Sequence, residues 1–371
     1  MPQDPQTRGW TIGHLFGGRV VLQPSSLVMI LILAFLWGTG GDGQITGQGF
    51  ARGGALALLL FASIFLHEMA HAFAARAYHR KVEAIVITLW GGHTHFDAKD
   101  MTPKISGVTA AAGPLMNAVL ALASWGALHL PLSDGAATAL GWLTYANLAL
   151  AIFNALPGIP MDGGRVLEAV IWAATGNRML GMKVAAWGGR VVALAYLGWV
   201  LRNALAAGGQ GERPSLMPIL WGFFLFSLLW PAAGQALRVA RIMERVEAST
   251  AIRTMRPAIG VPHTATVAAA LREAERAEAL EVVVLSEDGV GAGHFSVETA
   301  QGVPEAKRSA TSLSAVTIPI PRGTELPPGA TGQEVLAHAR EWWGRTDAIV
   351  VADEGTVVGV ILLAELSARL G

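Results

Sequence analysis

The segment His67-Glu68-Met69-Ala70-His71 places two imidazoles four residues apart, with a carboxylate beside the first. Positions i and i+4 share one face of a helix, so both histidines can point at one metal ion. Glu68 is then free to act as a general base toward water at that ion. The spacing predicts a metal site at which water is activated. The alternative interpretation is that the two histidines only cap a helix end.

A catalytic zinc site needs a third protein ligand and an open fourth position. The chain has no cysteine, so this ligand must be His, Asp or Glu. Asp162 is the strongest candidate, in the segment 154–165, NALPGIPMDGGR. Pro157 and Pro160 are expected to break a helix there, and the glycine pair after Asp162 allows the backbone to bend and approach closely. The alternative is a proline-kinked helix end with an interfacial aspartate.

The elements that must position these residues are membrane helices. The chain is 52% hydrophobic and only 15% charged, with a mean hydropathy of +0.45, whereas soluble domains carry roughly 25% charge. A bilayer-spanning helix needs about 20 mostly apolar residues. Six segments qualify: 20–38, 54–77, 105–130, 138–160, 184–201 and 216–237. The first is the weakest, because polar residues shorten its apolar stretch. The net charge of zero gives no sign of a nucleic-acid partner.

Positive charge is uneven between the connecting loops. Between the second and third spans lie Arg76, Arg80, Lys81, Lys99 and Lys104, and further basic residues follow the fourth and sixth spans. The opposite loops carry only Arg52, Arg202 and Arg213. By the positive-inside rule we expect a multi-pass protein of the cell membrane with its N-terminus and its C-terminal tail in the cytoplasm. His67, His71 and Asp162 would then share the inner half of the bilayer.

Residues 82–98, VEAIVITLWGGHTHFDA, are rich in β-branched residues and broken by Gly91-Gly92. This pattern predicts a short β-hairpin. Open strand edges cannot face lipid, so the hairpin must pack against protein or line a cavity. His93 and His95 alternate along it, and we interpret them as polar residues on a wet face whose role stays open.

The HEMAH and NALPGIPMDGG motifs, in this order and membrane placement, resemble those of the site-2 protease family of intramembrane zinc metalloproteases, peptidase family M50. The resemblance covers about residues 1–240. It implies that His67, His71 and Asp162 bind one zinc ion and that Glu68 activates water. It also implies that Asn154 helps to hold the scissile carbonyl or its oxyanion. Residues 113–117, GPLMN, match a further family element, and we take Gly113 and Asn117 as residues that pack around or support the ligands.

The function implied by this resemblance is regulated intramembrane proteolysis. A peptide bond would be hydrolysed within or near the transmembrane segment of a single-span membrane protein, such as an anti-sigma factor. Two other functions stay open: a transporter or channel with a regulatory tail, and an inactive relative that binds membrane proteins without cleaving them. The intact set of His67, Glu68, His71 and Asp162 favours the protease.

Residues 245–371 read as a soluble α+β domain that follows a transmembrane domain at 1–244. Two passes, about 250–300 and 312–371, repeat the order strand, helix, strand, turn, strand, helix. This tail resembles a regulatory tandem CBS pair. Such pairs often bind adenine nucleotides with a late Gly-x-x-Ser/Thr-x-x-Asp pattern, but the copies here read Gly293-x-x-Ser296-x-x-Thr299 and Gly359-x-x-Leu362-x-x-Glu365. Because of these departures, an adenine nucleotide stays only one possible ligand of the pair, and homodimerisation or substrate gating is the favoured alternative.

Overall fold

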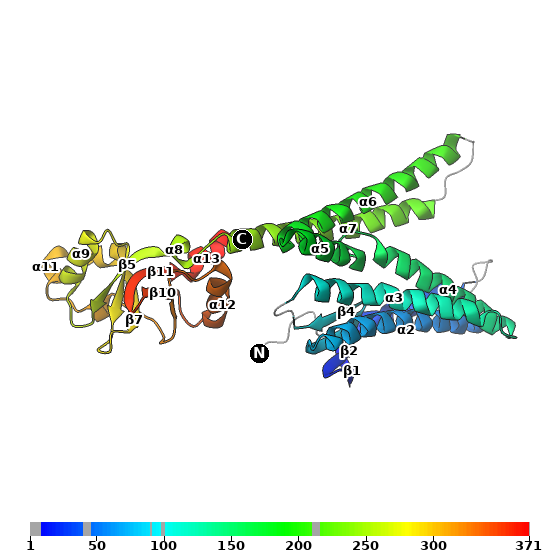
Figure 1. The fold of residues 1–371 in the computed structure, drawn as a ribbon, viewed down its shortest axis with the longest axis horizontal. Helices are drawn as coiled ribbons and strands as arrows, with labels where there is room; N and C mark the ends of the chain where they lie inside the picture. The colour runs from blue at the N-terminus through cyan, green and yellow to red at the C-terminus, as the bar shows by residue number, and fades with distance from the viewer. Residues whose placement is uncertain (1–8, 40–45, 90, 98–100, 210–215, 371) are drawn as a thin grey trace. The chain divides into compact units, whose positions relative to one another are not determined.

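The computed structural model describes residues 9–39, 46–89, 91–97, 101–209 and 216–370. The chain divides into two compact units, Met1–Ala240 and Arg241–Gly371. Figure 1 shows both units as ribbons and labels many of their elements. Lys99 and Arg213, two of the basic residues in the predicted loops, lie outside the described residues.

The N-terminal unit is polytopic, as predicted. In the described part of the chain, five helices are long and apolar enough to cross a bilayer. They are α2 (Gly47–Ala77), α3 (Pro103–Ala127), α4 (Asp134–Ala155), α6 (Arg178–Gly209) and α7 (Leu216–Glu247). Thr46, Thr102 and Ser133 cap the first three of these, because each side-chain oxygen accepts a hydrogen bond from a backbone N–H of the first turn.

The first predicted span differs from the structure. Residues 20–22 belong to strand β2 (Gly18–Leu22), and only Pro24–Gly38 form the apolar helix α1. Its 15 residues rise about 22 Å, which is shorter than the hydrocarbon core of about 30 Å. The physical reason is that β2 is held by pairing with strand β3 (Val82–Thr88), where Val21 lies opposite Val86.

A four-stranded sheet accompanies the helices, in the order β1-β2-β3-β4, with β1 at Trp10–Leu15 and β4 at Gly91–Phe96. Strands β3 and β4 are antiparallel and form the predicted hairpin, although residues 90 and 98 lie outside the described chain. Val82 and Ile85 of β3 are buried together with Ala72 of α2. The sheet therefore packs on the helix that carries HEMAH, with β4 at one edge of the described sheet.

The predicted proline break is present between α4 and α5. Helix α4 ends at Ala155, and the next helix, α5 (Asp162–Thr175), begins at the candidate ligand Asp162 itself. The intervening loop is anchored on α6, since the backbone N–H of Ile159 donates to the carbonyl of Ala185 at 3.0 Å. Met161 is buried against Ala193 of α6 and Leu229 of α7. The start of α5 is thus fixed by packing.

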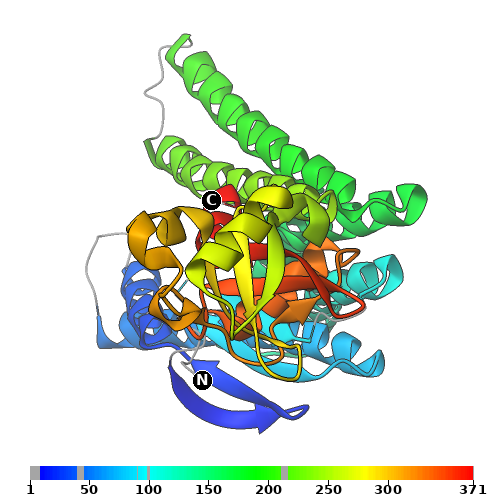
Figure 2. The same cartoon turned by 90° about the vertical axis from the view of Figure 1, so that its left-hand side faces the viewer.

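The C-terminal unit contains the predicted internal repeat. Its sheet has the order β8-β7-β6-β5-β11-β10-β9 and is drawn in yellow to red in Figure 2. The strands are β5 (Arg256–Pro262), β6 (Glu281–Leu285), β7 (Gly291–Ser296), β8 (Ile318–Pro319), β9 (Glu325–Leu326), β10 (Ala348–Asp353) and β11 (Thr356–Leu362). The helices are α8 (Ala251–Thr254), α9 (Val267–Arg276), α10 (Val297–Gln301), α11 (Glu305–Arg308), α12 (Gly332–Trp342) and α13 (Leu363–Leu370).

The two copies have the same internal pairing. In each, a strand pairs in parallel with the strand that follows the helix, and that strand forms an antiparallel hairpin: β5, α9, β6 and β7 in the first copy, and β9, α12, β10 and β11 in the second. Each copy has its own buried apolar cluster. Antiparallel pairing of β11 with β5 joins the copies into one sheet.

Candidate metal centre

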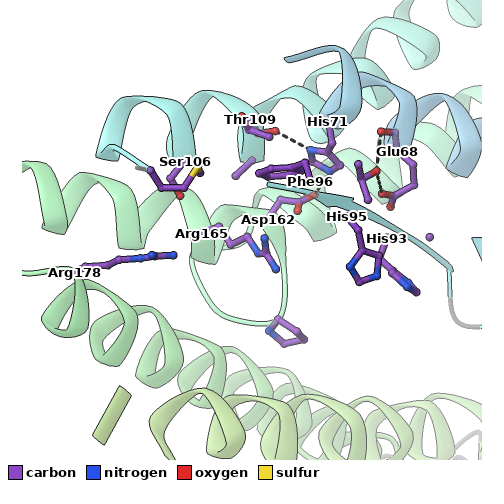
Figure 3. Close-up of a pocket in the computed structure, with 15 residues that line it drawn as sticks. Glu68, His71, His93, His95, Phe96, Ser106, Thr109, Asp162, Arg165 and Arg178 are labelled. Atoms are coloured by element: carbon purple, nitrogen blue, oxygen red, sulfur yellow. Dashed lines mark hydrogen bonds and ion pairs between the residues drawn. The ribbon is translucent and has the colours of Figure 1, made fainter. Parts of the chain in front are cut away.

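Three candidate ligand atoms converge between α2 and the start of α5. The Nε2 atoms of His67 and His71 lie 3.1 Å apart. The Oδ2 atom of Asp162 lies 3.1 Å from Nε2 of His67 and 3.3 Å from Nε2 of His71. Both histidines are buried, and Figure 3 shows His71 and Asp162 facing one another. The fold thus brings Asp162 beside two histidines that precede it in the sequence by 91 positions (His71) and 95 positions (His67).

The donor set fits zinc. A tetrahedral zinc site with bonds of about 2.0–2.1 Å separates neighbouring ligand atoms by about 3.3–3.4 Å, close to the observed triangle. The Nδ1 atom of His71 donates to the carbonyl oxygen of Thr109 at 2.7 Å, because a carbonyl can only accept. This leaves Nε2 of His71 without a proton and directed at the other two ligand atoms, as metal binding requires.

The backbone of α3 approaches the ligands at Gly113. A Cβ added to this residue would lie 2.4 Å from Nε2 of His71 and 2.5 Å from Nε2 of His67. Asn117, one turn further along α3, is fully buried and accepts from Nδ1 of His67 at 2.5 Å. Both residues that the sequence assigned to the surroundings of the ligands therefore contact the histidines.

Glu68 is buried between α2 and β4. The hydroxyl of Thr94 on β4 donates to its Oε2 at 2.8 Å and also lies 3.0 Å from its backbone oxygen. Gly92, two residues earlier on the same face of β4, has no room for a side chain, since a Cβ there would lie 2.4 Å from Cγ of Glu68. The sequence analysis missed Gly92 and Thr94 as site residues. Their signal is the period-two alternation of GGHTHF, which puts 92 and 94 on one face and the histidines on the other.

Two cavities meet at Glu68 and Asp162. A polar one of about 350 Å³ is lined by residues that include His93, His95, Arg165 and Arg178, and Figure 3 shows these four around it. An apolar one of about 490 Å³ is lined by residues from six helices and the hairpin, among them Leu33, Phe61, Leu150, Phe153, Trp221 and Phe224. Asn154 lies on the wall of the apolar cavity, together with His67 and Glu68. The centre therefore has a polar approach on one side and an apolar approach on the other.

Candidate metal ligands on the apolar helix α2 and at the start of α5, with a buried carboxylate beside them, are typical of a membrane-embedded class of metallopeptidase. Residues 55–132 and 131–198 match the model of Peptidase family M50. This family match lies within the membrane unit and confirms the resemblance to the site-2 proteases that the two motifs predicted.

Individual proteins agree with the family match. The chain is 32% identical to a "Putative zinc metalloprotease" of Synechocystis over 65% of its own length and 62% of that protein. It is 28% identical to the "Putative zinc metalloprotease Rip3" of Mycobacterium tuberculosis over 96% of its own length and 91% of that protein. Among solved structures, the site-2 protease from Methanocaldococcus jannaschii is 24% identical, with a TM-score of 0.43, over 62% of this chain and 95% of that chain.

The tail has its own structural neighbours. CBS-domain structures of a bacterial CNNM/CorC family Mg²⁺ transporter are 15–16% identical, cover 37% of the chain and have TM-scores of 0.26–0.27.

Proposed function

We propose that this protein is an intramembrane zinc metalloprotease, which hydrolyses a peptide bond within or near the transmembrane segment of a membrane protein. The observation that carries the proposal is the triangle of His67, His71 and Asp162, with Glu68 buried beside it. The two histidines and Glu68 lie on α2, which is long and apolar enough to span a bilayer, and Asp162 begins α5. Charged groups in such segments are costly and are retained for function.

The chemistry divides among a few residues. His67, His71 and Asp162 would hold the zinc ion, which would supply Lewis-acid chemistry toward a carbonyl oxygen and toward water near neutral pH. Glu68 takes a proton from this water and delivers it to the leaving amine nitrogen. Thr94 fixes the Glu68 carboxylate for this task. The amide of Asn154 donates to the carbonyl oxygen as negative charge develops there.

The two cavities support an extended substrate segment. An unwound stretch with apolar residues on one side of the scissile bond and polar residues on the other would match them. The backbone amides of a membrane helix are already hydrogen-bonded, so the substrate must unwind locally before attack. The edge of β4 is suited to pair with such a segment by strand addition. We propose a single-span protein, such as an anti-sigma factor, as the substrate.

We further propose that the tail regulates the protease, as a homodimer or as a gate for substrate, from the cytoplasmic side of the cell membrane. Two residues at the nucleotide-pattern positions make contacts within the protein. Glu365 forms an ion pair with Arg256, and Ser296 accepts from the backbone N–H of Thr299 at 3.1 Å as the cap of α10. These contacts support a role without an adenine nucleotide.

The direct test is a comparison of membrane proteomes between cells with the wild-type protein and cells with Glu68→Gln. We expect one or a few single-span proteins to accumulate uncut in the variant strain, while the variant protein reaches wild-type levels in the membrane. Identical proteomes would contradict proteolysis. If the purified protein also held no zinc, the result would indicate a transporter. If it held zinc while the proteomes were identical, the result would indicate an inactive scaffold.

A further inference from the structure

A chain of buried side-chain amides leads from His67 into the helix bundle. The Nδ2 atom of Asn117 donates to Oδ1 of Asn147 at 2.9 Å. Asn147 lies on α4, is fully buried, and contacts none of the three candidate ligands in the hydrogen bonds of the described chain. Its own Nδ2 lies 3.0 Å from the carbonyl oxygen of Leu143 and 3.0 Å from Oγ of Ser63.

The direction of every hydrogen bond in this chain follows from its far end. The Leu143 carbonyl can only accept, so the nitrogen of Asn147 must face it. The oxygen of Asn147 then faces Asn117 and requires the NH₂ group of that residue. The oxygen of Asn117 is consequently turned toward His67, whose Nδ1 must carry the proton.

Ser63 also requires the nitrogen of the Asn147 amide, and not its oxygen, on this side. Its hydroxyl donates to the carbonyl oxygen of Leu59 at 3.0 Å, which leaves its lone pairs free to accept from Asn147. Ser63 is also buried. Two backbone carbonyls of different helices therefore impose the same orientation on Asn147.

The consequence appears at the metal centre. With the proton on Nδ1, Nε2 of His67 presents a lone pair toward Asp162 and His71. His71 reaches the same state directly, through the Thr109 carbonyl. His67 depends on two amides that could each turn over if unpaired. We propose that Asn147 is a positioning residue, which fixes the tautomer of His67 through Asn117 and thereby sets the zinc affinity. The inference rests on the proposed zinc site.

Asn147→Leu tests it, because leucine fills a similar volume but cannot accept from Asn117. We expect zinc affinity, measured on the purified full-length protein by competition with a chromophoric chelator, to fall about 10- to 100-fold, the range typical of groups that orient a ligating histidine. Thr144→Val is the matched control. It removes the hydrogen bond from Thr144 of α4 to Ser124 of α3 without touching the amide chain, and should leave zinc affinity unchanged.

A double variant separates positioning from packing. Asp at position 117 has two acceptor oxygens, so in the Asn117→Asp background His67 Nδ1 meets an acceptor whatever stands at position 147. We expect Asn147→Leu to weaken zinc binding less than threefold in that background. An equal loss in both backgrounds would show a packing role and overturn the proposal, as would an unchanged affinity in the single variant. Failure of the wild-type protein to bind zinc would instead overturn the proposed metal site itself.

Discussion

Close backbone approach shapes the centre at the scale of single residues. Gly113 brings α3 against both ligating imidazoles, and Gly92 brings β4 against Glu68. Neither position has space for a methyl group. Because the two glycines contact different residues, a substitution at Gly113 should affect metal binding and one at Gly92 should affect the candidate base. The first contacts the metal ligands, and the second contacts the candidate base.

Gly113→Ala should expel the metal. Its Cβ would overlap Nε2 of both His67 and His71, so at least one imidazole must leave the triangle. We expect the zinc content of the purified protein, measured by elemental analysis, to fall well below the wild-type value. Gly126→Ala on the same helix meets nothing within 4 Å and should retain full zinc content. Normal zinc in Gly113→Ala would contradict the assignment of these ligands.

Thr94→Val should reduce proteolysis while zinc is retained. The variant removes the hydrogen bond to Oε2 of Glu68 but touches no candidate ligand. A hydrogen bond to a charged group contributes about 1.5–3 kcal/mol, so we expect kcat to fall about 10- to 100-fold. Thr94→Ser keeps the hydroxyl and should stay near the wild-type rate. Equal rates for the valine and serine variants would rule out this role of Thr94.

The sequence predicts the residues that lie in local motifs. His67, Glu68 and His71 follow from helical spacing, and Asp162 follows from a proline and glycine context that the structure shows as a helix break. Thr94, Gly92 and Asn147 could not be assigned in this way. The alternation along β4 puts Gly92 and Thr94 on one face but does not show that this face meets Glu68. The relation of all three residues to the centre arises only when β4 and α4 pack against α2 and α3.

At the scale of elements, the loop before α5 determines the position of Asp162, which is the first residue of that helix. Helix α6 approaches this loop through a glycine pair: a Cβ at Gly188 would lie 2.1 Å from the carbonyl oxygen of Pro157, and one at Gly189 would lie 2.0 Å from that of Ile159. The position of Asp162 therefore depends on a helix that contributes no ligand.

Gly189→Ala should weaken metal binding, although Gly189 contacts none of the candidate ligands. The added methyl group must push the loop away from α6, and overpacking of this kind costs about 1–3 kcal/mol. We expect a lower midpoint of thermal unfolding and a weaker zinc affinity. Gly198→Ala lies further along α6 and meets nothing within 4 Å, so it should match the wild type in both measurements. Wild-type zinc affinity in Gly189→Ala would show that the loop does not depend on this contact.

The sequence predicted the secondary-structure elements that hydropathy or a local hairpin defines. It did not predict strands that pair with residues far away in the sequence. The long apolar helices and the local hairpin β3–β4 were predicted. The N-terminal strands were not, because β2 is held by parallel pairing with β3, and the paired residues lie 65 positions apart in the sequence, as Val21 and Val86 do. The same pairing shortens the first predicted span to α1.

At the scale of the whole molecule, the membrane unit is joined to a tail whose two copies share a charged cluster, in which His294 and Glu281 are buried. His294 of the first copy lies 3.3 Å from Oε2 of Glu281 and 3.1 Å from Oδ1 of Asp347 in the second. Arg256 also contacts Glu281, at 3.2 Å. Burial disfavours the charged imidazole, but the hydrogen bonds that His294 donates to Glu281 and Asp347, together with their negative charge, outweigh it and raise the pKa of His294 above its ordinary value of 6.5.

The stability of the tail should therefore fall as the pH rises. Protonated His294 contributes stability that is fully present below its unfolded pKa and is lost as the pH passes through the raised folded pKa. We expect hydrogen exchange of peptides from β6 and β7, in the full-length protein and corrected for intrinsic rates, to quicken across that window. His294→Gln should abolish this component, whereas His263→Gln, at an exposed position, should retain it. A pH-independent exchange in the wild type would contradict the linkage.

The central claim is zinc-dependent proteolysis with Glu68 as the base. The most direct measurement is cleavage, in reconstituted liposomes, of the single-span protein that accumulates in the Glu68→Gln strain, with zinc content determined on the same samples. We predict cleavage by the wild type, its loss on zinc removal and return on zinc addition, and no cleavage by Glu68→Gln despite normal zinc. Equal cleavage by the wild type and by Glu68→Gln would contradict the account.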